Sequence, residues 1–106
     1  MIKTFKIKYC STENKPQIDI LNPVPETRYN ANSPITAKVK ITSAYPIKKV
    51  DYFLNDKYLG SSSTFPFSFS FTPNDTTAPG GKNELKAIVY DSSYNSNETF
   101  IELLID

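Results

Sequence analysis

Strict alternation of apolar and polar residues is the feature that most constrains the fold of this chain. In the segment Ile35–Thr42, Ile, Ala, Val and Ile alternate with Thr, Lys, Lys and Thr. Such a period of two places the apolar side chains on one face of a strand and the polar side chains on the other. Similar alternation recurs along the chain, whereas no helical period extends beyond one turn. The sequence therefore predicts an antiparallel sheet with one buried face.

Alternation and turn signals together divide the chain into a leading segment and one domain. We interpret residues 1–16 as a short leading strand, carried by Phe5, Ile7 and Tyr9, and a polar linker that ends at Pro16. Residues 17–106 are expected to form one all-β domain of seven strands, because turns about every 8–12 residues are typical of a two-sheet sandwich. The strands are predicted at residues 17–21, 35–42, 50–54, 58–61, 65–71, 84–90 and 99–105.

Inward-facing positions of these strands are expected to form the hydrophobic core. Phenylalanine repeats at period two over residues 65–71, so that a single strand would present four aromatic rings to the core. Each fully buried ring would stabilise the fold by about 1.5–3 kcal/mol. The expected core comprises Val39, Ile41, Val50, Tyr52, Leu54, Phe67, Phe69, Leu85, Ala87 and Val89.

Two polar segments between predicted strands are expected to be turns. Asn55 and Asp56 form a two-residue hairpin turn, because Asn and Asp tolerate a positive φ better than other non-glycine residues. Asp91 and Asn95 are expected to tie a second turn together by hydrogen bonds from side chain to backbone. A calcium site at this second turn, or at residues 74–75, is the alternative, although calcium requires about six to eight oxygen ligands.

Three segments resemble the family of bacterial Ig-like domains. Residues 49–60 (KVDYFLNDKYLG) resemble a hairpin of these domains, residues 65–72 (FPFSFSFT) an aromatic strand, and residues 81–91 (GKNELKAIVYD), followed by Asn95, the last hairpin. The resemblance covers residues 17–105 and implies an Ig-like or fibronectin-III-like sandwich. Asp56 and Tyr94 stand where the family has glycine, so the resemblance leaves the turn type at Asp56 open and the last hairpin is expected to be wider than in relatives.

A finer resemblance concerns the parent protein. Residues 44–48 (AYPIK) and 69–73 (FSFTP) are most similar to the C-terminal Ig-like module of class A penicillin-binding proteins of the 1C type, which are peptidoglycan glycosyltransferase/transpeptidases. This resemblance implies an extracytoplasmic accessory module, in the periplasm or at the cell surface, that spaces, orients or docks a larger exported envelope protein. Its partners would be neighbouring domains of that protein, peptidoglycan or another protein. An adhesin or stalk repeat is an alternative that predicts tandem copies.

Composition argues against catalysis within this chain. The sequence has no histidine and one cysteine, which excludes a Ser-His-Asp triad, a Cys-His dyad, imidazole metal ligands and an internal disulfide. The Ser-x-x-Lys and Lys-Thr-Gly motifs of transpeptidases are missing as well. A net charge of +1 argues against binding of the nucleic acid backbone as the main task. We predict that the chain is not an enzyme, uses no cofactor or metal, binds no nucleic acid and spans no membrane.

Aromatic residues outside the inward pattern suggest a binding surface. Phe53 alternates with Tyr52 and Leu54 and is therefore expected to face outward. Exposed rings could stack on sugar faces, and basic side chains could attract anionic wall polymers, so a module that binds cell-wall glycan is the main alternative to a spacer. Packing of these rings under loops or against the leading strand is the structural explanation. The candidate surface comprises Tyr45, Phe53, Tyr58, Tyr94, Lys38 and Lys40.

Overall fold

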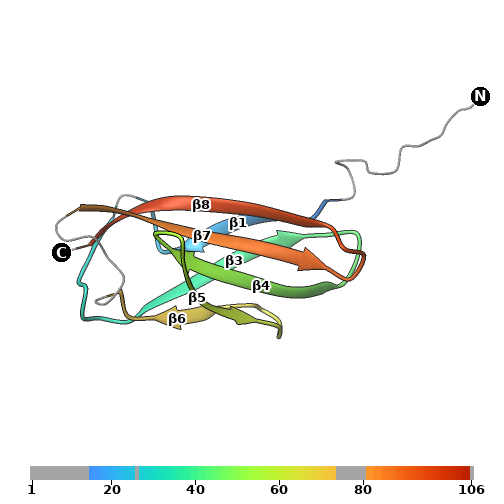
Figure 1. Cartoon of the computed structure of the whole chain (residues 1–106), viewed down its shortest axis with the longest axis horizontal. Helices are drawn as coiled ribbons and strands as arrows, with labels where there is room; N and C mark the ends of the chain where they lie inside the picture. The colour runs from blue at the N-terminus through green and yellow to red at the C-terminus, as the bar shows by residue number, and fades with distance from the viewer. Residues whose placement is uncertain (1–14, 26, 74–80, 106) are drawn as a thin grey trace, which may run out of the picture.

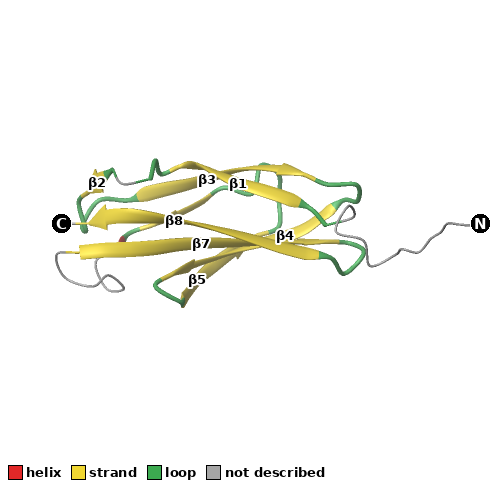
Figure 2. Cartoon of the chain, turned by 90° about the horizontal axis from the view of Figure 1, so that it is seen from above, coloured by secondary structure: helices red, strands yellow, loops and turns green. Residues whose placement is uncertain are grey.

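The alternating segments form strands that stack as two sheets (Figures 1 and 2). The computed structural model describes residues 15–25, 27–73 and 81–105. Over these residues the strands are β1 (Gln17–Asn22), β2 (Arg28–Tyr29), β3 (Ile35–Thr42), β4 (Ile47–Leu54), β5 (Lys57–Ser62), β6 (Phe69–Phe71), β7 (Gly81–Asp91) and β8 (Ser96–Ile105). One sheet has the order β1-β3-β6 and the other the order β2-β8-β7-β4-β5.

The predicted all-β sandwich is confirmed, with one strand more than the alternation indicated. The additional strand is β2, which contributes two residues and pairs in parallel with β8 at Arg28↔Leu104 and Tyr29↔Ile105. Two residues are too few to show a period of two, and therefore no local pattern predicts this strand. The predicted leading strand at residues 5–9 lies outside the described residues.

The core lies between the two sheets and is densest over β4 and β7. The inward-facing side chains of these strands have no exposed area; they are Val50, Tyr52, Leu54, Leu85, Ala87 and Val89. From the smaller sheet, Ile18, Ile35 and Ala37 pack against them. Three residues of the expected core, Val39, Ile41 and Phe69, are only partly buried. The sandwich is therefore open to solvent along part of the smaller sheet.

The prediction of four phenylalanines on one strand face is wrong. Strand β6 contains only Phe69–Phe71, and the side chain of Phe65 is 83% exposed. Phe67 is buried but has a φ of 64°, which interrupts the alternation of an extended strand. Pro66 also lacks the N–H group that a ladder requires. The strand therefore begins four residues later than the sequence pattern indicates.

The hairpin between β4 and β5 has the tight geometry that its sequence suggests. Asn55 and Asp56 have φ values of 53° and 67°, the left-handed conformation of a type I′ turn. The side-chain oxygen of Asn55 accepts a hydrogen bond from the backbone N–H of Glu84 at 2.9 Å, and this bond holds the turn against β7. Across the hairpin the register shifts between Tyr52 and Phe53, which makes a bulge next to Gly60.

The described chain starts and finishes at opposite ends of the sandwich (Figure 1). The carbonyl of Pro16 accepts a hydrogen bond from the Asn97 side chain at 2.9 Å, so β1 begins beside the start of β8. Strand β8 then runs to Ile105, eight residues beyond Asn97, or about 26 Å at the rise of an extended strand. Within the described residues, no helix is long and apolar enough to cross a membrane.

Candidate functional site

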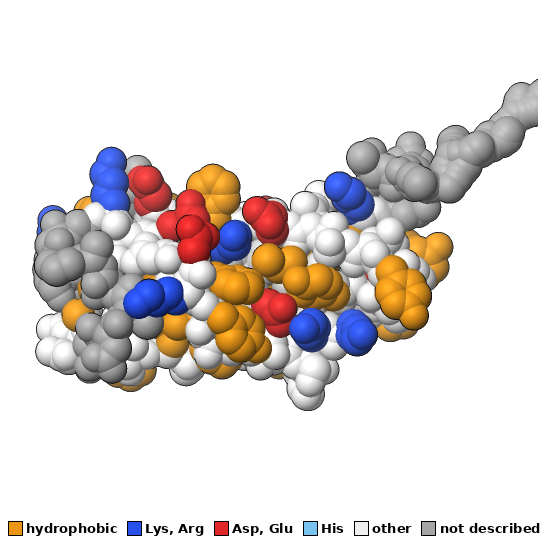
Figure 3. Space-filling view, viewed as in Figure 1, with side chains coloured by type: hydrophobic (Ala, Val, Ile, Leu, Met, Phe, Trp, Pro, Cys, Tyr) orange, Lys and Arg blue, Asp and Glu red, His pale blue; other side chains and the backbone are white. Residues whose placement is uncertain are grey.

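A row of large side chains crosses the outer face of the five-stranded sheet. The register places Tyr58 opposite Phe53, Phe53 opposite Lys86, and Lys86 opposite Phe100, so the row spans β5, β4, β7 and β8. Tyr58 and Phe100 are 60% and 58% exposed. Figure 3 shows hydrophobic side chains gathered over the middle of this face, with acidic and basic side chains among them. We call these four residues the outer row.

Phe53 faces outward as the alternation predicts, but its ring is not an open platform. The ring of Tyr58 meets it edge-on, with centroids 5.6 Å apart and planes at 63°. The Nζ atom of Lys86 lies over the Phe53 ring, 5.4 Å from its centroid, in a cation–π contact. Neighbours therefore cover much of Phe53, and the exposed ring area of the row belongs to Tyr58 and Phe100.

Two members of the outer row, Lys86 and Phe100, lie outside the predicted binding surface, and only Phe100 carries a signal in the sequence. It lies in β8, where Ile101, Leu103 and Ile105 point inward and the intervening positions point outward. An aromatic residue at an outward position of this strand is the same signal that singles out Phe53 on β4. The alternation of residues 99–105 could therefore have identified Phe100.

Asp51 lies on the same outer face, yet it is only 7% exposed. Its Oδ2 atom is 3.4 Å from the Nζ atom of Lys49. Its Oδ1 atom is buried and has no hydrogen-bond partner among the described residues. Lys49 also lies over the Tyr90 ring, with Nζ 5.0 Å from the centroid. The outer face thus combines aromatic rings, lysines and one nearly buried carboxylate.

The six residues of the candidate binding surface do not form one site. Phe53 and Tyr58 belong to the outer row, whereas Lys38 and Lys40 are exposed on β3 of the other sheet. Tyr45 and Tyr94 are 40% and 96% exposed and lie in the turns that follow β3 and β7. Those two turns touch at one end of the sandwich, where the Ser92 N–H donates to the Pro46 carbonyl at 2.9 Å.

The turn after β7 is built around the carboxylate of Asp91. Oδ1 accepts hydrogen bonds from the backbone N–H groups of Ser93 (2.8 Å) and Asn95 (2.9 Å), and Oδ2 accepts one from the Asn95 side chain (3.0 Å). Burial raises the pKa of the Asp91 carboxyl, but these three hydrogen bonds outweigh it and lower the pKa below its usual value. The turn therefore occupies both oxygens of the carboxylate.

The calcium alternative receives no support at the Asp91 turn. In the part of the chain that the structure describes, no three Cys, Asp, Glu or His side chains are grouped as metal ligands would be. Residues 74–75, which were the other candidate, lie outside the described residues.

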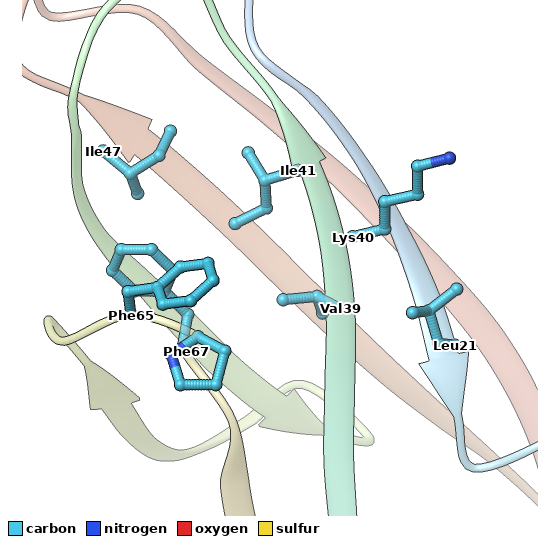
Figure 4. A pocket seen from close by; sticks show the side chains of 8 residues that line it. Leu21, Val39, Lys40, Ile41, Ile47, Phe65 and Phe67 are labelled. Atoms are coloured by element: carbon cyan, nitrogen blue, oxygen red, sulfur yellow. The ribbon is translucent and has the colours of Figure 1, made fainter.

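A second candidate surface is an apolar groove of about 350 Å³ at the open side of the sandwich. Its lining consists of Leu21, Val39, Lys40, Ile41, Ile47, Phe65, Pro66 and Phe67. Figure 4 shows Val39 and Ile41 pointing from β3 toward Phe65, Phe67 and Ile47. Both the groove and the outer row are suited to binding through packing, stacking and backbone contacts.

Comparison with known proteins identifies the family. The bacterial Ig domain family matches residues 16–87. The chain is similar to a structure described as fibronectin(III)-like modules of CbhA from Clostridium thermocellum, with a TM-score of 0.72 and 26% identity over 84% of this chain and 94% of that one. Human titin ZIg10 shares the fold, with a TM-score of 0.52 and 19% identity over 100% of this chain and 92% of that one. No curated protein matches the chain significantly. The chain belongs to the bacterial Ig domain family.

Proposed function

We propose that this chain is a non-catalytic extracytoplasmic module that spaces and orients its neighbours within a larger bacterial envelope protein. One observation carries the proposal: Pro16 and Ile105 lie at opposite ends of the sandwich, about 26 Å apart along β8. A domain with this arrangement keeps whatever precedes it apart from whatever follows it. The β ladders between these ends make the spacing stiff.

The larger protein is proposed to be a penicillin-binding protein. The resemblance of residues 44–48 and 69–73 to the 1C type of these enzymes is the support for this identity. The similarity to modules of CbhA supports a role as one part of a longer chain. Under this proposal other domains carry out the transferase and transpeptidase chemistry, and this domain sets the spacing and orientation of its neighbours.

Single-molecule fluorescence transfer between the two ends tests the spacer. We would fuse a donor protein before Met1 and an acceptor after Asp106, and compare this fusion with one in which a Gly/Ser chain of 106 residues replaces the domain. A stiff module gives one narrow distribution of transfer efficiency, whereas the flexible chain gives a broad one. Equal widths for the two fusions would contradict the proposal.

Location is tested separately, in the bacterium that produces the protein. An antibody against this domain would be used on fractionated cells and on spheroplasts treated with protease. The proposal predicts a periplasmic or surface fraction and cleavage from outside. Protection of the domain together with a cytoplasmic marker would refute the extracytoplasmic role and leave the spacer geometry unaffected.

Glycan binding by the outer row is a second candidate function. The exposed rings of Tyr58 and Phe100 favour it, because they lie on one face about 14 Å apart, three strand spacings across the sheet. Co-sedimentation with isolated sacculi provides the test. We expect Phe53→Ala and the double variant Tyr58→Ala/Phe100→Ala to reduce pelleting several-fold, while Tyr94→Ala, a control at the end of the sandwich, leaves it unchanged. Pelleting that none of these substitutions alters would exclude the outer row.

A further inference from the structure

Strand β3 is longer than the strand that should accompany it. Of its eight residues, only Ile35, Thr36 and Ala37 pair with β6, opposite Phe71, Ser70 and Phe69. The remaining five residues, 38–42, pair with β1 along one edge. Along the other edge, no strand among the described residues accompanies them. Unpaired N–H and C=O groups at a strand edge are a template for another strand.

The course of residues 65–68 explains why this edge is open. The backbone of Phe67 is left-handed, and its carbonyl accepts a hydrogen bond from the buried hydroxyl of Tyr52. The carbonyl is thereby directed into the core of the sandwich and away from a ladder with β3. Pro66 has no N–H to offer to such a ladder. The chain consequently leaves the edge of β3 where the phenylalanine pattern would have continued it.

The apolar groove lies beside this open edge. Val39 and Ile41, the inward-facing residues of the part of β3 with one open edge, point into it and are only partly buried (Figure 4). On the opposite side, Phe65 is 83% exposed, and beyond β3 Leu21 is 58% exposed. A strand laid along β3 would bury apolar side chains at alternate positions in the groove.

The charge on the outward face of β3 indicates which side chains the added strand would have at its outward-facing positions. Lys38 and Lys40 are exposed there and form no ion pair with any residue that the structure describes. Side chains directly opposite on neighbouring strands stabilise a sheet when their charges differ and destabilise it when they match. Acidic residues are therefore favoured at the positions of the added strand opposite Lys38 and Lys40. The leading segment of this chain carries Lys6 and Lys8 between its apolar residues and would bring like charges together.

We propose that residues 38–42 of β3 and the groove beside them bind an extended peptide segment of a partner protein, with apolar residues at alternate positions and acidic residues between them. The segment adds to the β1-β3-β6 sheet as a strand of about five residues, or about 16 Å. Its backbone pairs with the free edge, its apolar side chains enter the groove beside Val39 and Ile41, and its carboxylates face Lys38 and Lys40. This site is on the smaller sheet and is independent of the outer row.

Binding of two synthetic ten-residue peptides tests the proposal. One peptide alternates valine with glutamate, and the matched peptide alternates valine with lysine. By titration calorimetry we expect the glutamate peptide to bind the full chain at least tenfold more tightly. Amide exchange should slow within residues 38–42 when the glutamate peptide is present.

Charge reversal on the exposed face of β3 provides the decisive variant. Lys38→Glu/Lys40→Glu should reverse the preference between the peptides, and Phe65→Ala at the rim of the groove should weaken both several-fold. The control Lys57→Glu/Lys82→Glu makes the same change of charge at exposed lysines of the other sheet and should leave the tenfold preference in place. Reversal by the control as well would show general attraction between charges and overturn the proposal.

Three further results would overturn it. The first is that neither peptide binds. The second is that the glutamate peptide binds only after residues 1–14 are removed, which would make the leading segment the occupant. The third is a dimer in sedimentation that Lys38→Glu/Lys40→Glu dissociates, which would make a second copy of the chain the occupant of the edge. Each of these results leaves the spacer role proposed above intact.

Discussion

The hydroxyl of Tyr52 on β4 donates a hydrogen bond to the backbone carbonyl of Phe67, the residue at which the phenylalanine-rich segment leaves its strand pattern. Tyr52 has no exposed area, and its ring stacks on that of Phe69 with centroids 5.5 Å apart and planes at 14°. One side chain of the larger sheet thus contacts both Phe69 at the start of β6 and Phe67, which lines the groove. The contact lies next to the part of β3 that has no partner strand along this edge among the described residues.

Removing the Tyr52 hydroxyl is expected to destabilise the fold. Tyr52→Phe keeps the ring but leaves the Phe67 carbonyl without its donor, at a cost of about 1–3 kcal/mol in the free energy of unfolding. Urea unfolding followed by circular dichroism measures the change. The control Tyr58→Phe removes a hydroxyl from a side chain that is 60% exposed and should change the free energy by less than about 0.5 kcal/mol. Equal losses of unfolding free energy in the two variants would show that the hydrogen bond from Tyr52 to the Phe67 carbonyl does not stabilise the fold.

The same hydroxyl predicts a loss of stability in alkaline solution. Burial raises the pKa of Tyr52 from 10.0 to about 12. Between these values the unfolded chain has released the proton and the folded chain retains it, so the free energy of unfolding falls as the pH rises from about 10 to about 12. Below about pH 10 the stabilisation that comes from the protonated Tyr52 hydroxyl is fully present. Urea midpoints measured from pH 9 to pH 12 should fall more steeply for the native chain than for Tyr52→Phe, and parallel curves would refute the assignment.

Gly60 is expected to be intolerant of a side chain because an aromatic ring occupies the space. A Cβ atom built there would lie 2.6 Å from the Cζ atom of Phe69. Gly60→Ala should therefore lower the free energy of unfolding by about 1–3 kcal/mol through overpacking. In the double variant with Phe69→Leu, the combined loss should be smaller than the sum of the single losses. Strict additivity would mean that the two residues do not compete for this space.

Replacing Tyr94 should stabilise the domain. This residue has a φ of 67° and is 96% exposed, so its side chain is strained on the backbone and packs against little. Tyr94→Gly relieves a strain of about 1–2 kcal/mol, which exceeds the backbone entropy that glycine loses on folding, about 0.5–1 kcal/mol. A rise in Tm is expected. Ser93→Gly, at the preceding position without a positive φ, should lower Tm, and the opposite order would contradict the prediction.

The Asp91 turn is expected to weaken in acid. Its hydrogen bonds lower the pKa of the folded carboxyl, so the stabilisation is present above the unfolded pKa of about 3.9 and is lost as the pH falls through the lower, folded pKa. The native chain should lose more stability between about pH 5 and pH 2 than Asp91→Asn does. Equal loss of stability in the native chain and in Asp91→Asn over this range would contradict the assignment.

Local patterns in the sequence are sufficient for the strands that alternate strictly. Ile35–Thr42 occupies the predicted positions of β3, and the inward triplets of β4 and β7 have no exposed area. The hairpin at Asn55 and Asp56 follows from the backbone preferences of two adjacent residues. Each of these features depends on neighbours in the chain, and therefore the amino-acid sequence read by itself determines them, together with the class of fold.

Only the tertiary structure decided where the phenylalanine-rich segment ends and which exposed residues lie together. The alternation of residues 65–71 is regular. The carbonyl of Phe67, however, accepts a hydrogen bond from the Tyr52 hydroxyl, 15 positions away in the sequence, and does not pair with β3. The outer row likewise depends on the registers of three strand pairs, which place Phe53 and Phe100 on either side of Lys86. Strand register and buried hydrogen bonds join residues that are distant in sequence. These interactions stabilise the fold only when both sheets are packed together, and therefore the alternation of a single segment does not predict them.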